Sequence, residues 1–211
     1  MAGEFVTRGA ILRNDMIRLN TDGTLDSTFS IGTGTSEPSL IRFIKVQADG
    51  KILVAGYITQ LNGVFGRSIR RLNQDGSEDT TFNQSGIDVV FVNSLDIQSD
   101  GKILIAAMNL AGFTFVTRLK TDGSNDQGVG QPLLFNGHTV TFLATENKIL
   151  IGGRFNYTVN QTQYQNLAKL NIDGTIDTTF TASITNSAFD LTVKTTPLAG
   201  GKILVWENST R

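Results

Sequence analysis

The sequence predicts an all-β fold, a β-propeller-like array of about four blades built from a repeat of about 50 residues. Two phrases recur in step along the chain, and no stretch shows the sustained 3.6-residue apolar periodicity of a helix. Repeat periods of about 40–50 residues that are rich in strands are typical of propeller blades.

The first phrase reads RLNTDGTLDSTF at 18–29, RLNQDGSEDTTF at 71–82 and KLNIDGTIDTTF at 169–180. A diverged copy, RLKTDGSNDQGV, begins at residue 118. The turn aspartates of the four copies are 53, 47 and 51 residues apart: Asp22, Asp75, Asp122 and Asp173.

The second phrase resembles DGKILVAG and also occurs four times. Its lysines are 51, 46 and 54 residues apart: Lys51, Lys102, Lys148 and Lys202. They could form a basic ring, but we expect each to cap the start of a strand and stay hydrated. The chain then forms a single β-propeller domain, 1–211, with repeat phrases at 18–58, 71–109, 118–155 and 169–206.

Each repeat is expected to contain three to four strands joined by hairpins. The first strand (39–47) is followed by an Asp-Gly turn, because glycine adopts positive φ freely and aspartate tolerates it. The second strand (51–58) is apolar on both faces, which predicts a central position in the sheet. A connection, a third strand (67–73), a second Asp-Gly turn and a short edge segment complete the repeat.

Small residues end the second strand at Ala55-Gly56, Ala106-Ala107 and Gly152-Gly153. We interpret them as positions where neighbouring blades approach closely, because only small side chains leave room there. The alternative interpretation is that they mark a β-bulge.

The two phrases in this order resemble the delta-60 repeat, also described as a β-propeller domain of unknown function found in bacterial surface proteins and phage proteins. The resemblance covers nearly the whole chain. It implies a propeller fold and provides no catalytic residues. The copy at 118 lacks the Thr-Phe end, and Asn147 replaces the turn glycine. The chain opens in the middle of a repeat, so its N-terminal strands could complete the last blade. The alternative is that another subunit completes this blade, which would make the protein a homo-oligomer.

The composition excludes several classes of protein. A net charge of −1 argues against a nucleic-acid partner, and the absence of cysteine excludes disulfides. No signal peptide and no apolar run of about 20 residues is found, so we expect no membrane insertion.

No enzymatic site or cofactor is predicted. Asparagine and aspartate in the turns (Asn20, Asp22, Asp26 and their equivalents) could bind Ca²⁺, but the spacing lacks the EF-hand pattern and favours structural turns, with no metal. His138 is the sole histidine, and no nucleophile or carboxylate near it in the sequence supports catalysis.

The connections between second and third strands are the candidate binding elements: 5–15, 58–68, 109–114 and 155–166. Candidate ligand residues combine aromatic rings with amides: Tyr157, Asn160, Gln161, Gln163, Tyr164 and Phe65. We therefore expect a non-enzymatic structural or attachment propeller of a phage particle (tail, fibre or capsid-associated), in contact with other virion proteins or a host-surface glycan or protein. The alternative is a carbohydrate- or protein-binding propeller module of a bacterial surface protein.

Overall fold

The computed structural model describes residues 7–8, 11–12, 15–35, 38–66, 68–126, 136–182, 184 and 192–208. Over these residues the protein consists of small antiparallel sheets, which confirms the all-β, propeller-like fold. The helical part of the described residues is a single 3-10 turn, η1 (Ala199–Gly201). No described helix has the length and apolar character needed to cross a membrane.

Three sheets share one plan, in which the second strand of the repeat lies between the first and the third. Their strands are β3 (Leu40–Val46), β4 (Ile52–Tyr57) and β7 (Ile69–Leu72), then β8 (Phe91–Ile97), β9 (Ile103–Met108) and β10 (Thr114–Leu119), then β11 (Asn136–Leu143), β12 (Lys148–Val159) and β13 (Thr162–Leu170).

Three two-stranded sheets complete the described strands. They are β1 (Thr7–Arg8) with β2 (Ile11–Leu12), β5 (Gln60–Leu61) with β6 (Val64–Phe65), and β14 (Thr192–Pro197) with β15 (Ile203–Asn208). The β1–β2 and β5–β6 hairpins occupy the same place in the repeat, whereas β14 and β15 are a first and a second strand.

The hydrophobic core lies between successive sheets. Every residue of β4 except its last is buried, as predicted for a central strand. Leu53 and Ala55 pack with Ile103 of the next repeat, whereas Ile52 belongs to a cluster with Met16 of the preceding one. Each central strand therefore joins two neighbouring sheets.

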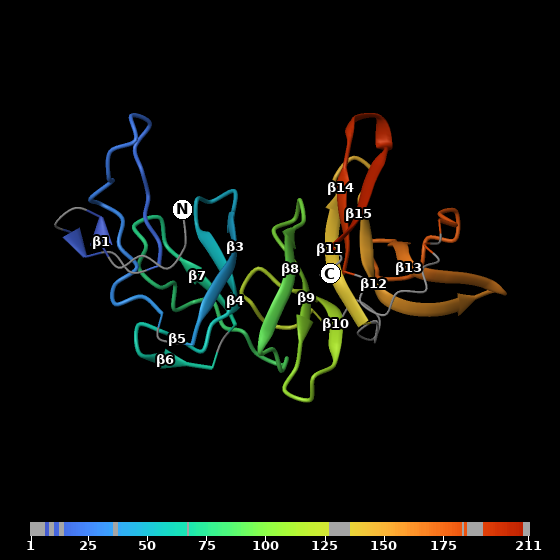
Figure 1. Ribbon diagram of the computed structural model, residues 1–211, viewed down its shortest axis with the longest axis horizontal. Helices are drawn as coiled ribbons and strands as arrows, with labels where there is room; N and C mark the ends of the chain where they lie inside the picture. The colour runs from blue at the N-terminus through green and yellow to red at the C-terminus, as the bar shows by residue number, and fades with distance from the viewer. Residues whose placement is uncertain are drawn as a thin grey trace.

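The first strands β3, β8, β11 and β14 lie side by side, and Figure 1 shows the sheets succeeding one another along the long axis. Polar contacts join these strands. The Lys45 ammonium lies 3.1 Å from the Asp96 carboxylate, and the backbone N–H of Phe142 donates to that carboxylate at 2.8 Å. Asp96 on β8 thus binds both neighbouring first strands.

The small residues at the end of the second strand have two roles. Ala55 and Ala106 are fully buried between sheets, which agrees with close approach of neighbouring blades. The following residue instead faces a β-bulge in the first strand, and the register shifts between Ile41 and Phe43 and at the equivalent places in β8 and β11. A Cβ on Gly153 would lie 2.2 Å from the carbonyl oxygen of Asn136, so this position requires glycine.

The turns before β4, β9 and β12 each have one left-handed residue. Gly50 has φ 82° and Gly101 has φ 80°, and Asn147 takes the same region with φ 52°. Asparagine tolerates this conformation better than most residues, so the departure at 147 leaves the turn intact.

Candidate functional site

The aspartates of the first phrase are held by their own turns. The Asp22 carboxylate accepts hydrogen bonds from the backbone N–H of Thr24 at 2.9 Å and from its hydroxyl at 2.6 Å. The same pair of bonds recurs at Asp75, Asp122 and Asp173. These bonds lower the pKa of Asp22. The aspartates therefore cap their own turns, as the sequence predicted. Among the described residues, no group of three or more His, Cys, Asp or Glu is placed to hold a metal ion.

The second aspartate of the phrase binds the arginine that opens it. Arg71 Nε donates to the Asp79 carboxylate at 2.7 Å, and the guanidinium lies 4.9 Å from the centre of the Phe82 ring. Arg18 and Asp26 form the same pair at 2.7 Å. Hydrogen bonds from Thr28, followed by the bond from Arg18, lower the pKa of Asp26 to about 2.

The same arginine also reaches the turn of the next repeat. Arg71 Nη1 donates to the carbonyl of Thr121 at 2.5 Å, and Arg118 Nη1 donates to that of Ile172 at 2.6 Å. Arg18 makes the equivalent bond to Gln74. The phrase is therefore a clamp between successive repeats. Sequence reasoning missed this role, although the constant separation of eight residues between arginine and aspartate was a usable signal.

Three lysines of the second phrase join this clamp, a contact that the sequence analysis did not predict, while their side chains stay about a third exposed. Lys51 lies 2.7 Å from the Asp79 carboxylate, and the equivalent pairs, Lys102 with Asp126 and Lys148 with Asp177, measure 3.2 and 3.4 Å. Burial alone would raise the pKa of Asp79, but hydrogen bonds from Lys51, Thr81 and Arg71 outweigh it and lower the pKa.

The diverged copy at 118 keeps the clamp. Arg118 Nε donates to the Asp126 carboxylate at 2.8 Å, and the Asp122 turn is formed. The departures in this copy therefore leave its described turn and its arginine–aspartate pair in place.

The last copy of the phrase differs, because lysine replaces arginine. Lys169 Nζ lies 2.6 Å from the Glu146 carboxylate and 4.7 Å from the centre of the Phe180 ring. Its cation thus binds within its own repeat.

The predicted binding loop 155–166 is a β-hairpin, so the prediction of a loop was wrong. β12 and β13 pair from Asn156 with Gln165 to Val159 with Thr162. The turn consists of Asn160 (φ 48°) and Gln161 (φ 65°). Both residues are left-handed, as a two-residue type I′ turn requires.

Five of the six candidate ligand residues lie on this hairpin, where Tyr157 and Tyr164 are cross-strand partners, and the sixth lies elsewhere. Tyr164 is fully buried in the core, so its assignment as a ligand residue was wrong. Asn160, Gln161 and Gln163 are exposed on the hairpin, where Gln163 donates to the Asn156 side chain at 2.9 Å, and Tyr157 is 41% exposed. Phe65 lies on β6, on the opposite side of the molecule from the hairpin in Figure 1, and is 72% exposed.

The connection between β9 and β10 also exposes apolar side chains, which sequence reasoning did not single out. Leu110 is 79% exposed and Phe113 is 65% exposed. Two large apolar residues within the short segment NLAGFT were the available signal.

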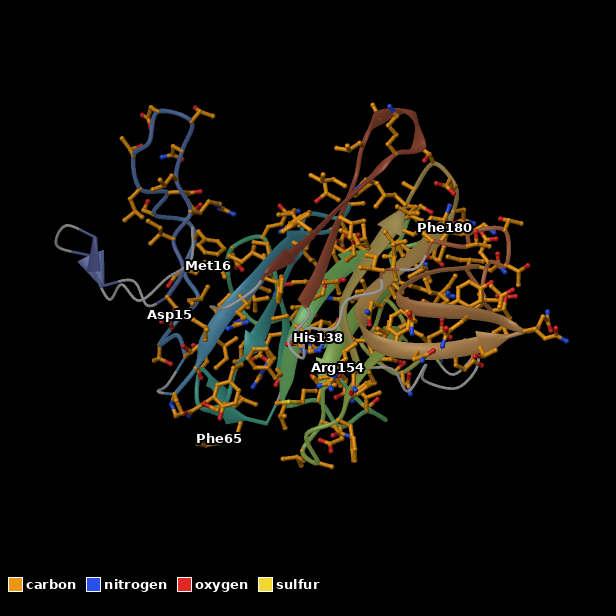
Figure 2. All side chains as sticks on the ribbon, turned by 45° about the vertical axis from the view of Figure 1, so that its right-hand side comes forward. Asp15, Met16, Phe65, His138, Arg154 and Phe180 are labelled. Carbon is orange, nitrogen blue, oxygen red and sulfur yellow. The ribbon has the colours of Figure 1, made fainter. Side chains whose placement is uncertain are left out.

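His138 lies at the bulge of β11, half-buried, and Figure 2 shows it close to Arg154. The residues of β12 that pair around the bulge are Gly152, Gly153 and Arg154, and none of these provides a carboxylate.

The chain matches a family model described as a β-propeller domain of unknown function (DUF5122) over residues 1–29, 47–82 and 147–180. Each matched segment ends at the phenylalanine that closes the clamp phrase. This match supports a β-propeller repeat family. No curated protein matches the chain.

Proposed function

We propose that this chain is a non-enzymatic attachment module that binds its partner through the connections between second and third strands. The observation that carries the proposal is the exposure of apolar side chains on three successive connections: Val64, Phe65, Leu110, Phe113 and Tyr157. Aromatic and aliphatic side chains presented on a rigid β scaffold are typical of interaction surfaces.

The setting that we propose is a phage particle, in which the module is a tail, fibre or capsid-associated component that contacts other virion proteins or the host surface. The resemblance to a repeat found in phage proteins supports this setting, as does the cysteine-free sequence. Mass spectrometry of purified particles is expected to detect the chain, and particles that lack it would contradict the setting.

The tip of the β12–β13 hairpin favours a second candidate, a carbohydrate-binding module of a bacterial surface protein. Tyr157 offers an aromatic face, and Asn160 and Gln161 place amide groups at the exposed turn. Aromatic faces next to amide donors and acceptors suit sugars as ligands.

Binding of the fluorescently labelled chain to a panel of bacterial cells and to a glycan array tests both candidates. We expect Phe65→Ser combined with Phe113→Ser to weaken attachment at least tenfold if the apolar connections bind, and Tyr157→Ala to do so if the hairpin binds sugar. Unchanged binding by all these variants would contradict the proposal. Turnover of broad glycosidase or esterase substrates would contradict its non-enzymatic part.

A further inference from the structure

We propose that the edge of the molecule at which β3 and β8 begin binds an acidic sugar, and that Arg42 recognises the negatively charged group of this sugar. Three side chains form the acidic-sugar site: Arg42 on β3, Tyr57 at the end of β4 and Phe91 at the start of β8. The choice of ligand rests on the attachment function proposed above and specifies the chemistry of the molecule to which the chain attaches.

Arg42 occupies a β-bulge. The register of β3 against β4 shifts between Ile41 and Phe43, so Arg42 is the extra residue of its strand. Asn93 and His138 are the extra residues at the equivalent shifts in β8 and β11. A bulge re-aims a side chain relative to the regular pleat, and bulges are frequent beside functional sites. All three bulges therefore carry a polar side chain near the start of a first strand.

The bulges of β3 and β8 lie at the same level of the molecule. Arg42 of β3 contacts Phe91 of β8, and Lys45, three residues further along β3, contacts Asp96, five residues further along β8. The two strands therefore run in the same direction, and Figure 1 shows them as neighbours. Arg42 and Asn93 thus belong to one edge of the molecule, although they come from different repeats.

The guanidinium of Arg42 is held by aromatic contact across the boundary between two sheets. It lies 4.8 Å from the centre of the Phe91 ring, and that ring lies 6.3 Å from the ring of Tyr57. Stacking on a ring fixes the position of a guanidinium, but its N–H groups lie in its own plane and remain available as donors. Arg42 is therefore oriented for a ligand before the ligand arrives.

The charge of this site calls for an anion. Arg42 is exposed and forms no ion pair with a described residue. Four other arginines each pair with a carboxylate: Arg18, Arg70, Arg71 and Arg118. The equivalent positions in the next repeat hold Asn93 and Met108, so they bring no acidic side chain to this edge. An anionic group on the ligand would supply the partner that the other arginines find within the chain.

The surroundings of Arg42 favour a sugar as the carrier of this anionic group. Tyr57 is 37% exposed, and its cross-strand partner Leu40 is 42% exposed. Together they offer a small apolar face, on which the C–H face of a sugar ring can pack while its acidic group accepts paired hydrogen bonds from the guanidinium. Asn93, which is half-buried at the neighbouring bulge, adds an amide donor and acceptor for sugar hydroxyl groups.

An array of acidic oligosaccharides, each printed beside its neutral counterpart, tests the proposal. The acidic members carry glucuronate, sialate or a sugar phosphate, and the counterparts are the methyl esters or the dephosphorylated sugars. We expect at least one acidic member to bind about tenfold or more tighter than its counterpart, and this binding to weaken as salt screens the exposed charge. Equal or absent binding of all pairs would overturn the proposal. Poly-L-glutamate bound as tightly as the best sugar would also overturn it, because the partner would then be an acidic protein.

Substitutions copied from the next repeat test the two exposed residues of the site. Arg42→Asn and Tyr57→Met introduce the residues that β8 and β9 carry at the equivalent positions, so the sheet should still form. By calorimetry with the best acidic oligosaccharide, we expect Arg42→Asn to weaken binding about tenfold or more and Tyr57→Met about threefold or more. Lys120→Asn is the matched control. It removes one exposed cation at the opposite end of the β8–β9–β10 sheet and should bind like the wild type.

An Arg42→Asn variant that binds like the wild type, or a Lys120→Asn variant that loses as much, would overturn the acidic-sugar site. If Phe65→Ser combined with Phe113→Ser abolishes attachment to cells while Arg42→Asn retains it, the attachment function stands and the acidic-sugar site fails. If the wild type binds acidic oligosaccharides through Arg42 but attaches to no cell, the site stands and the attachment function fails. Circular dichroism verifies that each variant is folded, and Arg42→Gln replaces Arg42→Asn if that variant is unfolded.

Discussion

The second aspartate of the repeated phrase uses its two oxygen atoms for different tasks. Oδ1 of Asp79 accepts from the backbone and hydroxyl of Thr81, whereas Oδ2 accepts from Lys51 and Arg71. One carboxylate therefore fixes the local turn and binds two cations, Lys51 just before β4 and Arg71 on β7. This double role explains why arginine, aspartate and threonine recur together in the phrase.

The depressed pKa of Asp79 predicts acid lability. The folded pKa lies below the value of about 3.9 for an unfolded aspartate, so the unfolded chain binds more protons between the two values. The free energy of unfolding should fall as the pH drops through this interval. We expect Asp79→Asn to cost about 3 kcal/mol at pH 7, and much less at pH 2, in urea titrations. A cost that is independent of pH would contradict this assignment.

Tyr164 shows that an aromatic residue on an exposed hairpin can belong to the core. Its hydroxyl is buried and has no hydrogen-bond partner among the described residues. Tyr164→Phe should therefore leave the free energy of unfolding unchanged or raise it by up to about 1 kcal/mol, whereas Tyr164→Ala should lower it by about 3–5 kcal/mol. Thermal and urea unfolding measure both, and a loss above 1 kcal/mol for the phenylalanine variant would reveal an unrecognised partner.

At the scale of the strands, the β-bulge in each first strand limits the size of the residue that faces it at the end of the second strand. Ala107 fits opposite the bulge of β8, but Gly153 lies too close to Asn136 for any side chain. We expect Gly153→Ala to lower the free energy of unfolding by about 1–3 kcal/mol. Urea unfolding measures the loss, with Gly200→Asn as the control because Gly200 is exposed with open space around it. A Gly153 variant as stable as the wild type would show that β11 can shift to accept the methyl group.

The sequence located the strands well where turn residues mark both ends. The strands expected at 39–47 and 51–58 are β3 and β4, within one residue at each end, because the Asp-Gly turn separates two apolar runs. The hairpin at 155–166 escaped prediction because its turn, Asn160-Gln161, contains no glycine. The alternation of Tyr157 and Val159 with polar residues was the remaining indication of a strand.

Contacts between distant parts of one repeat were harder to predict than the repeats themselves. Lys51 and Asp79 are 28 residues apart, and their contact depends on how the third strand returns beside the second. The candidate site divided as well, because Tyr164 is fully buried whereas its cross-strand partner Tyr157 is 41% exposed.

At the scale of the whole molecule, the first three copies of the phrase bind the following turn in one manner. Arg18, Arg71 and Arg118 each donate to a carbonyl in the following turn, and the central strands pack between neighbouring sheets. Stability in such arrays is approximately a sum of repeat and nearest-neighbour terms. The clamp phrase therefore contributes to the nearest-neighbour terms that join the separate sheets.

The measurement that tests this clamp most directly is the urea unfolding of Arg118→Lys. Lysine keeps a cation beside Asp126 but loses the bond from Arg118 Nη1 to the carbonyl of Ile172. A clamp between repeats predicts a loss of about 1–3 kcal/mol in the free energy of unfolding. Lys169→Arg, at the copy whose lysine binds within its own repeat, should change it by less than about 0.5 kcal/mol. An Arg118→Lys variant as stable as the wild type would contradict the clamp.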